Sequence, residues 1–125
     1  MTNNKTDDLQ EMHDEIKCFL LDEIKADKQE TFMYQLHYES FFDEQKLNDL
    51  LSKYERYLAI SNQEIEEEIY TGVVNVFLHT FFLFYCHNVK EDMYKIKNYK
   101  QINHDNTSDY YSKMKSLIFN RKRSE

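Results

Sequence analysis

Apolar side chains recur at steps of three and four residues along most of this chain, which is the spacing of one face of an α-helix. This pattern predicts helices over residues 9–24, 32–40, 43–58, 62–87, 89–102 and 110–118. Residues 93–97 also alternate between apolar and polar, so a short strand is an alternative for that segment. The pattern as a whole predicts an all-α fold of five or six helices.

The most apolar part of the chain is residues 70–89, which contain no Asp, Glu, Lys or Arg. Ser61 and Glu64, a few residues earlier, have the S-x-x-E spacing of a capping box, so we expect this helix to begin near Asn62. A helix that is apolar on nearly every side is usually buried. We therefore expect a compact bundle around this central helix, in which the other helices wrap it or a second copy of the chain covers what they leave open.

A membrane-spanning helix is the main alternative for the same segment, because residues 70–89 are long enough to cross a bilayer. The segment also contains the polar residues Asn75 and His79. Such side chains are costly in hydrocarbon and can be hydrogen-bonded in a protein core. We therefore expect a core helix and no membrane partner.

Composition supports a single helical domain. The chain has one glycine and no proline, so it lacks the residues that usually form tight β-turns. We expect one domain over residues 1–125, with flexible ends at 1–5 and 121–125. Cys18 and Cys86 lie in apolar helical patterns, and the N-terminal residues do not resemble a signal peptide. These features predict a reduced, cytoplasmic protein.

The motifs of common enzymes are absent from the sequence. One glycine cannot supply a nucleophile elbow, a P-loop or a dinucleotide-binding loop. No C-x-x-C or H-x-x-x-H pair suggests zinc, and the nearest approach to a di-iron E-x-x-H motif has Gln10 before His13. We therefore predict a protein that is not an enzyme and that needs no cofactor or metal.

Charge is distributed unevenly along the chain. The net charge is −7, and residues 1–70 hold 18 acidic and 7 basic residues, whereas residues 71–125 hold 5 and 9. One interpretation is that these charges simply solvate helix surfaces, and the other is that an acidic surface attracts basic partners. The second interpretation predicts an inhibitor, a neutralising or immunity-type protein, or a regulatory adaptor that docks on a basic surface of its target. The candidate contact residues are Glu64, Glu66, Glu67, Glu68, Tyr54, Tyr57 and Tyr70.

Two other functions remain open. Asn75, His79 and Cys86 lie on one line of the central helix with Gly72, and they would suit a sensor with a pocket for a small ligand or a metal. The simpler explanation is that a neighbouring helix crosses closely at these residues. Alternatively, the acidic residues 7–68 imitate a nucleic acid and block an enzyme that binds one. Direct binding of nucleic acid is not expected from an acidic chain.

Overall fold

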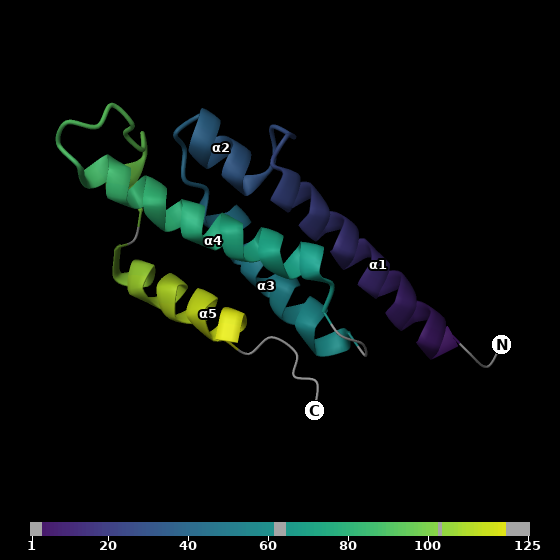
Figure 1. Cartoon of the computed structure of the whole chain (residues 1–125). Coiled ribbons are helices and arrows are strands. Elements are labelled where there is room, and N and C mark those ends of the chain that lie inside the picture. The colour runs from purple at the N-terminus through teal and green to yellow at the C-terminus, as the bar shows by residue number, and fades with distance from the viewer. Residues whose placement is uncertain (1–3, 62–64, 103, 120–125) are drawn as a thin grey trace.

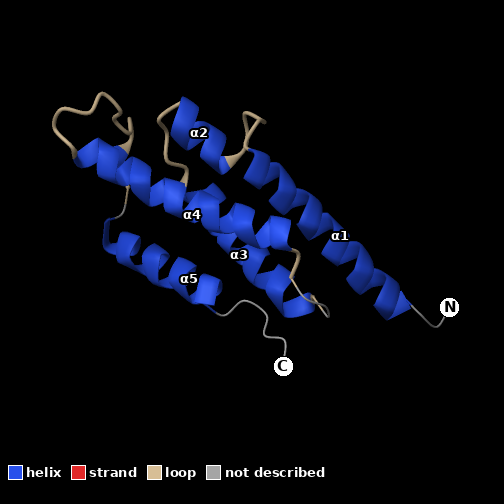
Figure 2. Cartoon of the chain, in the orientation of Figure 1, coloured by secondary structure: helices blue, strands red, loops and turns tan. Residues whose placement is uncertain are grey.

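The computed structural model describes residues 4–61, 65–102 and 104–119. These residues form helices and loops without any strand (Figure 2), which confirms the all-helical prediction. The elements are α1 (Asn4–Lys25), α2 (Phe32–Tyr38), α3 (Glu44–Ile60), α4 (Glu67–Asn88) and α5 (Thr107–Phe119), with two 3-10 turns, η1 (Tyr99–Gln101) and η2 (His104–Asn106).

Four of the predicted helices, over residues 9–24, 32–40, 43–58 and 110–118, correspond to α1, α2, α3 and α5. Of the ends predicted to be flexible, residues 1–3 and 121–125 lie outside the described residues, whereas residues 4 and 5 belong to α1.

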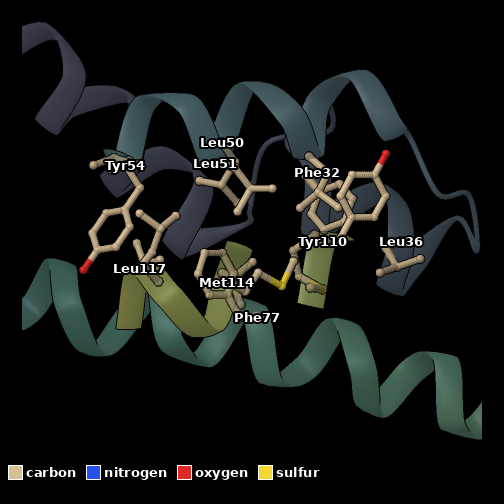
Figure 3. Close-up of a cluster of buried hydrophobic side chains, with 14 of the residues drawn as sticks. Phe32, Leu36, Leu50, Leu51, Tyr54, Phe77, Tyr110, Met114 and Leu117 are labelled. Carbon is tan, nitrogen blue, oxygen red and sulfur yellow. The ribbon is translucent and has the colours of Figure 1, made fainter. Parts of the chain in front are cut away.

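The helices pack around a shared apolar interior. α1 contacts α2, α3 and α4, while α5 contacts both α3 and α4 (Figure 1). Large side chains from α2, α3, α4 and α5 meet in the core (Figure 3), and Tyr54 and Phe77 pack edge to face with ring centroids 6.4 Å apart. Burying a side chain of this size stabilises a fold by roughly 1.5–3 kcal/mol. Tertiary packing of these aromatic and aliphatic groups therefore holds the helices together.

The central helix begins later than the capping box predicts. Ser61 ends α3 instead, because its backbone N–H and its hydroxyl both donate to the carbonyl of Tyr57, at 3.1 and 2.7 Å. Glu64 lies outside the described residues, and α4 begins at Glu67. A serine can satisfy the end of one helix or the start of the next, and here it satisfies the end.

The predicted helix over residues 89–102 is wrong, and so is the alternative strand. The segment is a loop that includes only the short turn η1. The side chain of Asn88 donates to the carbonyl of Phe84, and Lys95 Nζ donates to the carbonyls of His87 and Val89 at 3.1 and 2.9 Å. These contacts satisfy the last carbonyls of α4, so they terminate that helix and do not start a new one.

α1 and α4 cross closely at Gly72. A Cβ atom placed on Gly72 would lie 2.5 Å from Cγ2 of Ile24 on α1, well inside van der Waals contact. This confirms the expectation that a neighbouring helix crosses α4 at its glycine. The absence of a side chain at this position allows the two helices to approach each other.

We predict that Gly72→Ala destabilises the protein by about 1 kcal/mol, because overpacking costs roughly 1–3 kcal/mol and better helix propensity returns about 1 kcal/mol. Ile24→Ala removes the clashing atoms. In that background Gly72→Ala should therefore raise the free energy of unfolding, which means that it becomes stabilising. Urea denaturation of the four proteins of this double-mutant cycle measures the coupling. Equal effects of Gly72→Ala in both backgrounds would show that the two residues do not restrict each other.

Candidate functional site

One face of α4 is exposed to solvent, although its sequence predicts burial on all sides. Leu78, Phe82 and Tyr85 are 61%, 55% and 66% exposed, and we call these three residues the apolar stripe. α4 packs against α1, α2 and α5, and these neighbours leave this face uncovered (Figure 1). The other helices therefore do not cover α4 on every side, and the alternative, that a second copy of the chain covers the open face, stays a prediction.

Among the helices of the described residues, α4 alone is long and apolar enough to cross a membrane. In its most apolar stretch 44% of the residues are buried within the chain. Core helices of globular proteins meet the same criteria, so length and composition alone do not identify a membrane segment.

An open groove of about 480 Å³ lies along the exposed face of α4. One wall is α4, and the other is formed by the end of α1 and the start of α2. Its lining residues are Ile24, Met33, Gly72, Asn75, Val76, Leu78, His79 and Phe82. Asn75 and His79, two of the predicted ligand-pocket residues, both line this groove. Cys86 does not line it, because its side chain is buried near Asp92, where burial and this carboxylate raise the pKa of the thiol.

Two histidines meet at this groove. His37 Nδ1 of α2 and His79 Nε2 of α4 are 2.9 Å apart, so one ring donates a hydrogen bond and the other accepts it when both are neutral. Burial, and then the proximity of His37, lowers the pKa of His79 from its usual 6.5. In the part of the chain that the structure describes, no third His, Cys, Asp or Glu joins the pair to complete a metal site.

The tyrosines predicted to contact a partner are mostly internal. Tyr54 and Tyr57 are 0% and 1% exposed, so neither is available as a contact residue, and Tyr70 is half-buried against the core. The Tyr57 hydroxyl accepts a hydrogen bond from the backbone N–H of Glu66 at 3.4 Å. A tyrosine can be buried where its hydroxyl finds such a partner, and this corrects the predicted aromatic docking surface.

The acidic candidates remain at the surface. Glu66, Glu67 and Glu68 are exposed at the start of α4, and Glu66 forms an ion pair of 2.7 Å with Lys17 of α1. The hydrogen bond to Glu66 raises the pKa of Lys17. The pair brings the start of α4 next to Lys17, and further exposed carboxylates lie on residues 8–15 of α1. We call these exposed carboxylates together the acidic end, and its residues are Asp8, Glu11, Asp14, Glu15, Glu66, Glu67 and Glu68.

Glu23 is a buried carboxyl that the sequence pattern does not single out. It is 6% exposed and accepts a hydrogen bond of 2.9 Å from the backbone N–H of Phe32. Burial raises the pKa of Glu23. Because Phe32 is the first residue of α2, Glu23 satisfies a free N–H group at the start of that helix, which explains its burial without a catalytic role.

Comparison of the chain with models of known families, with curated proteins and with solved structures gives no match. The case for a function therefore rests on the acidic end, the groove and the apolar stripe.

We predict that His79 makes the protein less stable in mild acid. Because the folded state lowers the pKa of His79, the unfolded chain binds its proton more readily, and stability falls as the pH drops below 6.5. Once the pH is below the lowered pKa of His79 in the folded state, no further stability is lost through this residue. The difference in unfolding free energy between wild type and His79→Gln should therefore change between neutral pH and pH about 5. A constant difference over this range would contradict the prediction.

Proposed function

We propose that this chain is a cytoplasmic protein without a reaction of its own, which acts by binding another protein through its acidic end. The observation that carries the proposal is the concentration of exposed carboxylates on residues 8–15 of α1 and the first residues of α4. Carboxylates gathered on one surface produce a negative field that attracts a basic surface and speeds association. The target's contact surface is then rich in Lys or Arg.

An inhibitor, a neutralising or immunity-type protein and a regulatory adaptor would all use this attraction. So would a mimic of nucleic acid, which is the special case in which the basic surface of the target is a nucleic-acid groove. The identity of the target separates these roles. Neither a membrane nor a nucleic acid is the partner that we propose.

We predict that Glu11→Lys, Glu15→Lys and Glu68→Lys together abolish capture of the target from native extract. The matched control is Asp27→Lys, Glu30→Lys and Glu91→Lys, which changes the net charge equally at exposed positions outside the acidic end. Wild type and control should retain one stoichiometric protein in low salt and lose it in high salt, because screening weakens exposed charge pairs. Equal capture by all three proteins, identified by mass spectrometry, would exclude the acidic end as the contact surface.

A ligand sensor is the second candidate function, and the contact between His37 and His79 beside the groove favours it. The groove offers apolar walls from Ile24 and Met33 together with the polar groups of Asn75 and His79. A ligand with an apolar body and one polar group would suit such a lining. A divalent metal would bind the two imidazoles weakly, because the remaining ligands would have to come from outside the pair.

Titration with Zn²⁺, followed by calorimetry and by the imidazole NMR signals, tests the metal form of this candidate. Binding at the pair should disappear in both His37→Gln and His79→Gln and persist in His13→Gln. Binding that is unchanged by the first two substitutions, or absent from the wild type, would exclude a metal sensor at the groove.

A further inference from the structure

The exposed face of α4 has the geometry of a helix–helix interface. Its exposed residues repeat at steps of four, four, three, four and three, and they are Glu67, Thr71, Asn75, Leu78, Phe82 and Tyr85. Successive steps of three and four keep side chains on one narrow line along a helix, as at the seam of a coiled coil. From this geometry we infer that a second copy of the chain packs on the face, with the two α4 helices antiparallel.

The exposed side chains on this face are aromatic toward the C-terminal end of α4 and polar toward its N-terminal end. The groove extends along the face from Phe82 and Leu78 to Asn75 and the buried Gly72. In an antiparallel pair centred on Leu78, the rings of each copy face the Gly72 and Asn75 end of the other copy's groove. A parallel pair would place ring against ring and leave the grooves unfilled. The surface is thus complementary to itself, as a two-fold interface requires.

The charges at the two ends of α4 favour the same arrangement. Glu67, the first residue of α4, lies eleven positions before Leu78, or about 17 Å along the helix, and the last residue, Asn88, lies ten positions after it, or about 15 Å. Lys90 follows two residues beyond that end. Lys95 lies at the same end as Lys90, where it binds the last carbonyls of α4. An antiparallel pair therefore places the carboxylates of each copy near the lysines of the other and opposes the two helix dipoles. A parallel pair would bring like charges together.

Self-association through this face does not depend on the proposed binding of a target by the acidic end. Glu67 belongs to both the acidic end and the proposed dimer interface, but the exposed carboxylates of α1, including Glu11 and Glu15, lie outside the face of α4, so each copy in the dimer would still present them. Light scattering of the purified chain needs no target, whereas capture from extract does. Either idea can therefore fail without the other.

Multi-angle light scattering over a wide range of protein concentration tests the inference. Wild type should change from monomer to dimer as concentration rises, and Phe82→Arg should remain a monomer at concentrations where wild type is dimeric. Met93→Arg is the matched control, because Met93 is 95% exposed and lies outside α4, and it should still dimerise. Circular dichroism should show that all three proteins remain helical.

A charge exchange tests the antiparallel orientation. Glu67→Lys and Lys90→Glu should each raise the dimer dissociation constant by roughly two- to tenfold in low salt, because exposed ion pairs are weak. The double variant should recover most of the affinity, since its new lysine then faces a new glutamate in the other copy. A double variant weaker than either single one would overturn the antiparallel arrangement.

Two other outcomes would overturn the proposed dimer. If the wild type stays monomeric at all concentrations, no second copy binds the face. If the wild type dimerises and Phe82→Arg does not change this, the dimer uses another surface. If the monomeric chain instead sediments with phosphatidylcholine and phosphatidylglycerol vesicles, and Phe82→Arg abolishes this binding, the stripe is a membrane contact.

Discussion

The close crossing of α1 and α4 at Gly72 is the contact on which the arrangement of this protein depends. Ile24 occupies the space that a side chain at position 72 would need, so the two helices can approach each other at this point. The approach fixes which side of α4 faces α1 and α2, and hence which side is left for solvent. The groove begins at this crossing, with Gly72 and Ile24 both in its lining.

Charge separation gives the molecule two different ends. The start of α4 and residues 8–15 of α1 carry exposed carboxylates, and the loop after α4, residues 89–102, carries four lysines against two acidic residues. Such a distribution suits attraction to a basic target and also antiparallel contact between two copies. Both interactions weaken as salt screens the charges, but contact through the stripe also buries apolar surface, which salt does not screen. Ionic strength should therefore affect target binding more than self-association.

Local sequence signals identified most helices but not all of their ends. The steps of three and four apolar residues located α1, α2, α3 and α5, because these helices bury one face each. The same signal failed after Asn88, where Lys95 satisfies the carbonyls of α4 and the chain continues as a loop. Ser61 likewise matched a helix start and instead ends α3. A hydrogen-bonding side chain near a helix boundary has partners on either side, and sequence spacing does not choose between them.

By itself the sequence determined that the chain is helical, that residues 70–89 form an apolar segment and that the acidic residues are concentrated before it. It also identified Asn75 and His79 as neighbours on one face, because helical spacing fixes their relation. Tertiary structure alone decided that Tyr54 is internal and that His37 meets His79 from 42 positions away. Spacing reports contacts within a helix, whereas burial and contacts between helices depend on which faces pack together, and that is settled only when the whole core forms.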